Sequence, residues 1–233
     1  MNILHTGPLG VNTFVVPLKD NKVFIVDPAT CSFCRDENLI IDFLCSKNLI
    51  PVAFVLTHGH FDHVAGLSIL KEKYPLVPVL IHKNDAVMLG LNNSVQKEQL
   101  EYMGFSEFFD AVKNLPVCDS FLEDGKNLFD SLKNTACFSD LANIIKPVEK
   151  KLCEWKIIHT PGHTFGSVCL YNANEKILLS GDTLFYGSWG RTDLGGSESL
   201  IQKSLVLLKE NIPGDVQVFP GHDFAGFKMS ENF

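Results

Sequence analysis

The feature that most constrains the fold is an apolar run that leads directly into a histidine-rich segment. Residues 51–56 read PVAFVL, a near-continuous hydrophobic stretch of strand length. Such runs are typical of strands that are covered on both faces. Residues 57–63 follow at once as THGHFDH. The sequence therefore predicts a buried strand whose carboxyl end carries polar side chains.

The segments around this strand alternate between strand-like and helix-like patterns. Two runs rich in β-branched and aromatic residues predict a hairpin over residues 11–18 and 22–28. Apolar residues at helical spacing predict helices over residues 36–48 and 64–74, and residues 77–82 read as the next buried strand. This alternation is typical of an α/β sandwich.

The second half of the chain is less regular before strand patterns return. Helix-like stretches occur around residues 95–114 and 138–146, and strand-like runs lie within residues 155–182 and 217–222, separated by a helix over about 198–211. No repeat or low-complexity linker divides the chain, so residues 1–233 are predicted to form one domain.

An extra helical segment is predicted around residues 126–154. Its apolar residues recur at helix-like intervals, which fits an ordinary packed helix. A lid over the functional site or a dimer surface is the alternative.

Charge and hydropathy exclude several classes of function. Lys and Arg total 20 against 27 Asp and Glu, a net charge of -7, and such a field repels polyanions. No basic region precedes a long apolar stretch at the N-terminus, and no run reaches membrane-span length. We expect a cytoplasmic protein with a small-molecule substrate and neither nucleic-acid nor membrane partners. A homodimer remains open.

Seven cysteines are scattered through the chain without a disulfide framework, which favours reduced thiols in a chain of this length. Cys31 and Cys34 form a CxxC pair that could bind metal or undergo redox cycling. A zinc site of that type requires a second ligand pair at matching spacing, which the sequence lacks. Two free thiols in a polar loop are therefore the favoured interpretation.

Three imidazoles and a carboxylate are concentrated just after the buried strand, as His58, His60, Asp62 and His63. In an extended loop, positions 58, 60 and 62 point to one side because side chains alternate. Neutral imidazole is the commonest protein ligand of zinc, and a carboxylate adds charge that helps retain a divalent ion. The cluster therefore predicts a metal site.

Three further candidate ligands each follow a strand-like run: His163 in TPGHT, Asp182 in SGDT and His222 in PGHD. Loops at the carboxyl ends of strands in α/β folds commonly gather ligands. An isolated histidine is more often a surface residue, but five histidines and two aspartates in similar Gly- and Pro-containing loops favour convergence on one site.

The motifs THGHFDH, TPGHT, SGDT and PGH, in this order, resemble the ligand series of the metallo-β-lactamase superfamily. LGVNT at residues 9–13, VDP at 26–28, SGDTLF at 180–185 and GRTD at 190–193 resemble its glyoxalase II-like branch of hydrolases, including small single-domain members. The resemblance implies a four-layer αββα sandwich of two mixed β-sheets, with the site at one edge between the sheets.

The resemblance also implies two divalent metal ions, with zinc expected and iron or manganese as alternatives. The implied ligands are His58, His60 and His163 for one ion, Asp62, His63 and His222 for the other, and Asp182 as a bridge. Such a pair acidifies bound water towards a pKa of about 7. Asp62 and Asp182 are thus expected to act in catalysis through the metal centre.

Several neighbouring residues are expected to support the site. Thr57, Asp27 and Thr183 are placed to hydrogen-bond the ligands or their loops, with a simple turn role as an equal alternative. Arg191 and Asp193 are expected to form a structural ion pair beneath the site, which is favoured over contact with the substrate. Trp189 either lines a pocket or packs in the interior.

The implied activity is hydrolysis of a thioester or related acyl ester, as in hydroxyacylglutathione hydrolases. Those enzymes resemble this chain in the metal core but continue into a helical domain that binds glutathione, whereas eleven residues follow His222 here. One alternative is a persulfide dioxygenase with one iron on residues matching His58, His163 and Asp182. A phosphodiesterase or nuclease and a non-catalytic metal-binding protein are further alternatives, and β-lactam hydrolysis is disfavoured.

Overall fold

The computed structural model describes residues 1–232 and contains two mixed sheets. The first sheet has the order β1-β2-β3-β4-β5-β6, formed by β1 (Asn2–Thr6), β2 (Val11–Pro17), β3 (Lys22–Val26), β4 (Ile50–Val55), β5 (Val79–His82) and β6 (Ser120–Leu122). The second has the order β11-β10-β9-β8-β7, formed by β7 (Trp155–His159), β8 (Val168–Asn172), β9 (Ile177–Gly181), β10 (Gln217–Pro220) and β11 (Phe227–Lys228).

Strands β3, β4, β5 and β6 pair in parallel, as do β9 and β10, and the remaining neighbours are antiparallel. In a parallel set, all carboxyl ends lie at one edge of the sheet. Loops after β4, β9 and β10 can therefore meet at one end of the molecule.

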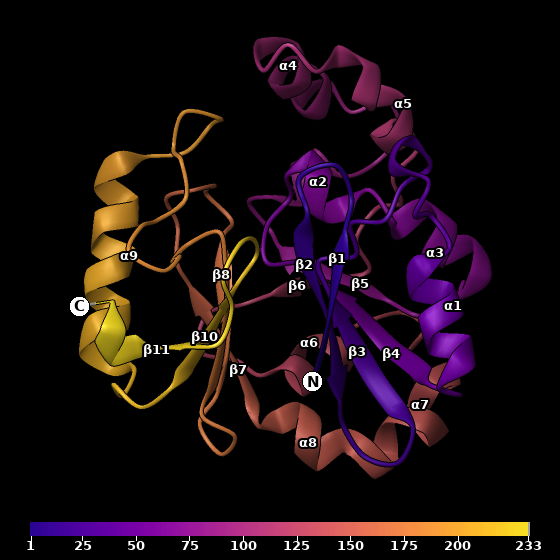
Figure 1. Ribbon diagram of the computed structural model, residues 1–233. Helices are drawn as coiled ribbons and strands as arrows, with labels where there is room; N and C mark the ends of the chain where they lie inside the picture. The colour runs from indigo at the N-terminus through magenta and orange to yellow at the C-terminus, as the bar shows by residue number, and fades with distance from the viewer. Residues whose placement is uncertain (233) are drawn as a thin grey trace.

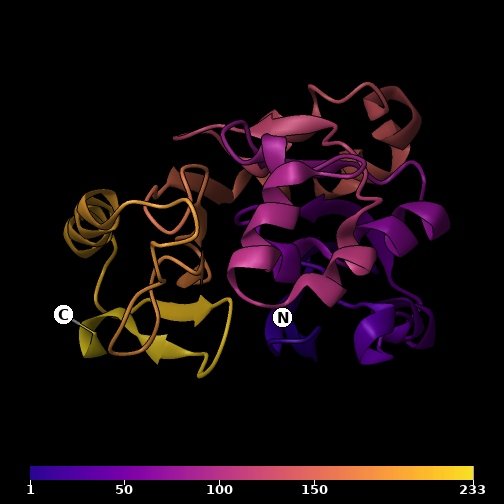
Figure 2. The same ribbon diagram turned by 90° about the horizontal axis from the view of Figure 1, so that it is seen from above.

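Helices cover the outer face of each sheet. Helices α1 (Leu39–Ser46) and α3 (Leu67–Lys73) lie against the first sheet, and α9 (Glu198–Asn211) lies against the second (Figure 1). Seen from above, α9 and the second sheet occupy one side of the molecule, and the first sheet with its helices occupies the other (Figure 2). This confirms the predicted αββα sandwich.

Strand alternation divides the core into three layers. Ile25 of β3 points outward into the cluster that contains Ile40 of α1. Its neighbour Phe24 points inward and meets Trp155 of β7 edge-on, with ring centroids 5.3 Å apart. Such an aromatic pair contributes about 0.5–1.5 kcal/mol beyond its buried area, so it helps to hold the two sheets together.

The segment 126–154 forms α6 (Leu128–Leu132), α7 (Phe138–Ile145) and α8 (Glu149–Cys153). Their apolar residues belong to the cluster between the sheets. In Figure 1, α7 and α8 lie at the opposite end of the molecule from α2 (Phe61–Val64), which carries two candidate ligands. The structure thus favours packed helices over a lid for this segment.

The remaining helices are short or lie at the ends of the sheets. Two α-helices, α4 (Ser94–Tyr102) and α5 (Phe109–Val112), occupy the same end as α2 (Figure 1). Short 3-10 helices complete the described residues: η1 (Ser32–Cys34), η2 (Ala86–Met88), η3 (Ser106–Phe108), η4 (Lys146–Val148) and η5 (Met229–Glu231). Within residues 1–232, no helix combines the length and apolar character that crossing a membrane would need.

The helix expected over 64–74 is observed as α3, which begins three residues later than expected, at Leu67. Before it, the Gly66 N–H donates to the Pro28 carbonyl at 2.9 Å, and α3 is separate from α2. The helix-like stretch expected around 95–114 contains α4, η3 and α5.

Candidate metal centre

The seven candidate ligands lie in loops at the same edge of the two sheets. His58 and His60 follow β4, and Asp62 and His63 sit in the short helix α2. His163 lies between β7 and β8, Asp182 directly follows β9, and His222 follows β10. The structure brings all seven together, six of them in two adjoining groups and Asp182 between these groups.

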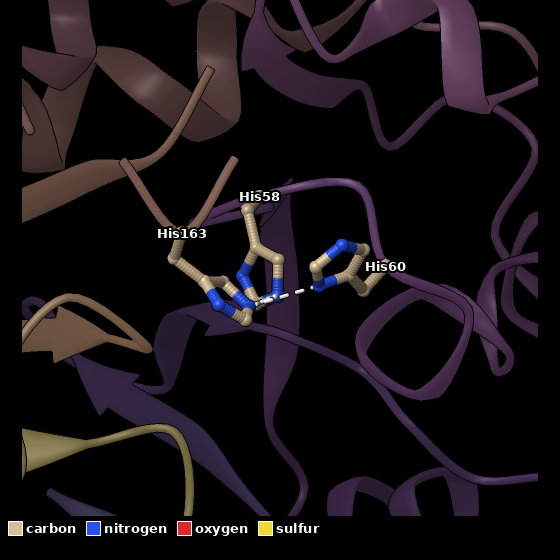
Figure 3. A group of neighbouring side chains, drawn as sticks. All are labelled: His58, His60 and His163. Carbon is tan, nitrogen blue, oxygen red and sulfur yellow. Dashed lines mark hydrogen bonds between the residues drawn. The ribbon is translucent and has the colours of Figure 1, made fainter. Parts of the chain in front are cut away.

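The first group contains three buried imidazoles from both sheets (Figure 3). His163 Nε2 lies 2.9 Å from His60 Nδ1 and 3.2 Å from His58 Nε2. Nitrogen ligands at about 2.0–2.1 Å from a tetrahedral zinc ion lie about 3.3 Å from each other. These two nitrogen–nitrogen distances are therefore close to the distance between nitrogen ligands of one zinc ion.

The second group combines two imidazoles and a carboxylate. His222 Nε2 lies 3.1 Å from His63 Nε2 and 3.2 Å from Asp62 Oδ2. These three side chains could hold a second ion, because their ligand atoms all lie within 4.8 Å of one another.

Asp182 lies between the two groups. Its Oδ1 is 3.4 Å from His63 Nε2, and its Oδ2 is 3.5 Å from His163 Nε2. Oδ1 is buried and accepts no hydrogen bond from the described part of the chain. A buried carboxylate oxygen without a donor is costly, so Oδ1 fits the position of a metal ligand, and the carboxylate as a whole faces both groups.

Each of the five histidines turns its other ring nitrogen towards a protein oxygen. These contacts are His58 Nδ1 to Thr57 Oγ1 (3.0 Å), His60 Nε2 to the Leu194 carbonyl (3.5 Å), His63 Nδ1 to Asp27 Oδ2 (3.0 Å), His163 Nδ1 to the Arg191 carbonyl (2.7 Å) and His222 Nδ1 to the Leu9 carbonyl (3.1 Å). Such acceptors keep the ring proton on the outer nitrogen. The inner nitrogen of each ring is then the one that can bind a metal ion once it is unprotonated.

The electrostatics differ between the two groups. Burial lowers the pKa of His58 and His163 well below the ordinary value and that of His60 to about 4. These imidazoles are therefore neutral at pH 7 and ready to act as ligands. Around His63, burial opposes the charged form, but the carboxylates of Asp182, Asp62 and Asp27 outweigh it and raise the pKa to about 10. Binding of a metal at His63 must displace that proton.

The two carboxylates between these histidines also differ. Burial raises the pKa of Asp182 to about 6. Burial acts in the same direction on Asp62, but the neighbouring His63 and His222 outweigh it and hold its pKa well below the ordinary range. Asp62 is thus ionised throughout the neutral range.

Asp27 and Thr57 link ligands of both groups, as the sequence predicts. Asp27 Oδ1 accepts the Thr57 backbone N–H at 2.7 Å, and Asp27 Oδ2 accepts the Thr57 hydroxyl at 2.6 Å. Because the same hydroxyl faces His58 and the same Oδ2 faces His63, one buried carboxylate orients an imidazole in each group. The third expected support, Thr183, shares a 2.8 Å hydrogen bond with Thr160 in the His163 loop.

The sequence interpretation missed the contacts that fix the His222 loop. The buried Asn12 of β2 donates through Nδ2 to the carbonyls of Pro220 and Asp223, at 3.0 and 3.2 Å. At the adjacent Gly221, a Cβ would lie 2.3 Å from Asp182 Oδ1. Only glycine allows the backbone this approach. The motif LGVNT carries Asn12, but spacing alone does not reveal its partners.

A cavity of about 340 Å³ opens onto the candidate ligands. Its apolar wall includes Phe61, Met103, Phe185 and Leu194. Helix α4 supports this wall, because Gln99 donates a 2.9 Å hydrogen bond to the Leu194 carbonyl. The cavity is therefore bounded on one side by the metal-binding edge and on the other by apolar side chains.

The expected pair of Arg191 and Asp193 is present, but its position was predicted wrongly. The guanidinium donates two 2.6 Å hydrogen bonds to the carboxylate. Both side chains are 49% exposed, and Arg191 lines the cavity, so the pair lies at the rim rather than beneath the site. Trp189 lines a different pocket, beside Leu184 and Val206.

The CxxC pair shows the features of free thiols. Both cysteines are free, and burial raises the pKa of Cys31 to about 12. Asp36, the third member of this cluster, already accepts the backbone N–H groups of Cys31 and Gly7 at 2.7 Å each. The pair is therefore poorly suited to hold a metal ion.

Comparison with known proteins places these features in a family. The family model of the metallo-β-lactamase superfamily matches residues 6–133 and 154–222. The probable metallo-hydrolase YqgX of Bacillus subtilis is 29% identical over 223 residues, which are 94% of this chain and 88% of that protein. A hydroxyacylglutathione hydrolase of Pectobacterium carotovorum is 28% identical, over 97% of this chain and 67% of that protein.

A solved structure shares the fold across nearly the whole length. The crystal structure of TTHA1623 in a di-iron-bound form aligns with a TM-score of 0.76 and 26% identity, covering 99% of this chain and 96% of that one. The gap in the family match, residues 134–153, falls on the helices that close the core between the sheets.

Proposed function

Because the chain belongs to the metallo-β-lactamase superfamily, we propose that it is a metal-dependent hydrolase of a small, uncharged acyl substrate, with a thioester as the leading class. The observation that carries this proposal is the convergence of the two ligand groups and Asp182 at one edge of an open cavity. The similarity to YqgX and to a hydroxyacylglutathione hydrolase supports the same class.

We propose that His58, His60 and His163 hold one divalent ion, that Asp62, His63 and His222 hold a second, and that Asp182 contacts both. Nitrogen and carboxylate donors suit zinc, and iron and manganese accept the same ligands. When bound, such a pair acidifies a water molecule and polarises the carbonyl of the scissile bond. No side-chain nucleophile is then required.

The chain's own residues have two further tasks in this proposal. The protein oxygens behind the histidines keep the outer ring nitrogens protonated, so the rings stay fixed during turnover. The apolar wall of Met103 and Leu194 limits access of water to the acyl group.

The charge of the cavity favours an uncharged substrate over a phosphodiester. Within residues 1–232, Arg191 is the one Lys or Arg that lines this cavity, and Asp193 already pairs with it. Asp223 adds a negative charge at the wall. Apart from the proposed metal ions, an anionic substrate would therefore meet no unpaired Lys or Arg among the described residues that line this cavity, whereas an apolar acyl group would contact Phe61 and Leu194.

The test is a substrate panel on zinc-reconstituted protein, with elemental analysis of the metal. We expect up to two metal ions per chain and turnover of a small acyl thioester, with little activity on a phosphodiester or a β-lactam. His222→Ala is expected to lower turnover at least about tenfold through loss of the second ion. The exposed His5→Ala is the matched control. Iron-dependent oxygen uptake with a persulfide, unaffected by His222→Ala, would establish a dioxygenase instead.

The state of the cysteines supports a proposal for the cellular compartment of the protein. All seven cysteines are free, which suits the reducing cytoplasm. We propose a small molecule as the partner in this compartment, and sedimentation of the purified protein would decide between monomer and homodimer.

A further inference from the structure

Asp85 is a fully buried carboxylate that touches none of the candidate ligands but bonds to both loops that carry the first group. It lies three residues after the end of β5. Its Oδ2 accepts the Gly59 backbone N–H at 3.0 Å and the Thr164 hydroxyl at 2.6 Å, and its Oδ1 accepts the Gly166 backbone N–H at 2.7 Å. Three donors thus compensate the burial of one charge.

These donors come from different sheets. Gly59 stands between His58 and His60 in the loop after β4, and Thr164 directly follows His163 in the loop between β7 and β8. One carboxylate therefore connects the two backbones that must approach each other to bring the three imidazoles together.

The carboxylate itself is held rigidly. The Asp85 N–H donates to the His82 carbonyl at 3.0 Å, and the Asp85 carbonyl accepts the Met88 N–H at 2.9 Å at the start of η2. The space around it is filled, because a Cβ at Gly166 would lie 2.5 Å from Asp85 Oδ1. Neither the carboxylate nor the His163 loop can shift without losing these contacts.

A second side chain holds the backbone carbonyl of Gly59. The buried Gln96 of α4 donates through Nε2 to the Gly59 carbonyl at 2.7 Å and to the Met88 carbonyl at 3.0 Å. Both polar backbone groups of Gly59 are therefore held by side chains from one segment, residues 85–96.

We propose that Asp85 is a positioning residue that sets the distance between the His58–His60 loop and the His163 loop, and so determines the affinity of the three-histidine group for its metal ion. This inference rests on the metal centre of the proposed function but not on the substrate. The second group depends instead on Asp27, whose carboxylate contacts His63 directly. Loss of Asp85 should consequently affect one group and spare the other.

Asp85→Asn tests this with little change in volume. Its amide has one oxygen, whereas backbone N–H groups face both positions of the present carboxylate. Whichever way the amide turns, its NH₂ group opposes the N–H of Gly59 or Gly166. The variant should therefore push the two loops apart even though it fits the same space.

Two background substitutions allow the zinc affinity of each ligand group to be measured separately. His222→Ala leaves the three-histidine group intact, and His60→Ala leaves the group of Asp62, His63 and His222. Zinc affinity is measured in each background by competition with a chelator. Asp85→Asn is expected to lower the affinity about 10–100-fold in the His222→Ala background, the usual effect of losing an outer-shell partner, and to change it less than about threefold in the His60→Ala background.

A matched pair at Thr164 checks the same contact more gently. Thr164→Ser keeps the hydroxyl that bonds to Asp85, and Thr164→Val removes it. We expect the valine variant, but not the serine variant, to lower zinc affinity in the His222→Ala background. This pair also decides the question if Asp85→Asn fails to fold.

The outcomes are distinct. Unchanged zinc affinity for Asp85→Asn and Thr164→Val in the His222→Ala background would overturn the inference, as would equal losses in both backgrounds, which indicate general destabilisation. Absence of zinc binding in the His222→Ala protein itself would overturn the metal centre together with this inference. A protein that shows the expected affinities but cleaves no thioester would contradict the proposed substrate alone.

Discussion

Replacing Asp27 by asparagine is expected to weaken the group of Asp62, His63 and His222, because it reverses the position of the proton on His63. Asp27 has a φ of 50°, a conformation that asparagine tolerates well. The backbone should therefore remain in place, and the change is confined to the hydrogen bonds of one side chain.

The direction of the new amide follows from its neighbours. The Thr57 N–H faces Oδ1 at 2.7 Å and cannot reverse, so the amide oxygen must occupy that position. The NH₂ group then lies where Oδ2 now accepts from the Thr57 hydroxyl and His63 Nδ1. The hydroxyl can rotate and accept, and the imidazole can change its tautomer. His63 then carries its proton on Nε2, the nitrogen that faces Asp182 and His222.

The magnitude follows from the hydrogen bond that is lost. A hydrogen bond to a charged group contributes about 1.5–3 kcal/mol. A tenfold change in affinity corresponds to about 1.36 kcal/mol. The zinc affinity of this group should therefore fall about 10–150-fold. His58 should be affected more weakly, because it contacts Asp27 only through the Thr57 hydroxyl.

The assay is zinc competition with a chelator in the His60→Ala background, which leaves this group alone. Nitrogen-15 NMR of the imidazoles in the zinc-loaded protein, in which His63 has lost its second proton, reports directly which ring nitrogen is protonated. Asp36→Asn is the control, because Asp36 also accepts two hydrogen bonds but contacts no candidate ligand. Wild-type zinc affinity in Asp27→Asn, with His63 still protonated on Nδ1, would refute the reasoning.

Three further predictions test other parts of the structure. Asp182→Ala should reduce the metal content of both groups, because its two oxygens face different histidines; elemental analysis showing full metal content would contradict this. Carboxylates hold the pKa of His63 at about 10 against the effect of burial. Metal binding between pH 7 and 9 should therefore release a proton, and the metal affinity should rise about tenfold per pH unit. Calorimetry in buffers of different ionisation enthalpy measures both effects. Leu141→Ala in α7 should lower the free energy of unfolding by about 2–5 kcal/mol while metal content stays unchanged, since Leu141 packs between the sheets; a chemical denaturation curve measures the first and elemental analysis the second.

The candidate ligands could be found from the sequence because each occupies a position that is legible locally. Every one stands shortly after a strand, in a loop or in the short helix α2, where polar residues follow an apolar run. In the second sheet, the parallel pair of β9 and β10 then places the ends that precede Asp182 and His222 at one edge. Local pattern and sheet geometry together account for the convergence.

The strands that the sequence did not reveal lie at sheet edges. Strands β1 and β6 border the first sheet, and β11 borders the second. An edge strand pairs on one side only and need not bury both faces, so its hydrophobic alternation is weak. Strand β6 has three residues and an exposed Phe121 at its centre, which leaves no pattern to recognise.

The supporting residues Asp85 and Asn12 could not be predicted, because their partners are remote in sequence. Asp85 bonds to residues 26 positions before it and 79 and 81 positions after it. Asn12 reaches across 208 and 211 positions. A carboxylate or amide in a loop has many alternatives to such a contact, and only the folded chain selects one.

The two buried carboxylates Asp27 and Asp85 explain how separate segments, in the case of Asp85 from different sheets, can hold ligands at fixed distances. Each sheet positions its own loops only to the accuracy of the packing between sheets, which rests on apolar contacts such as Phe24 with Trp155. Apolar contacts are non-directional, whereas a carboxylate with three donors fixes both distance and orientation. Asp27 joins β4 to α2, and Asp85 joins the β4 loop to the second sheet. The geometry of the candidate centre is thus determined by directional contacts built on a non-directional core.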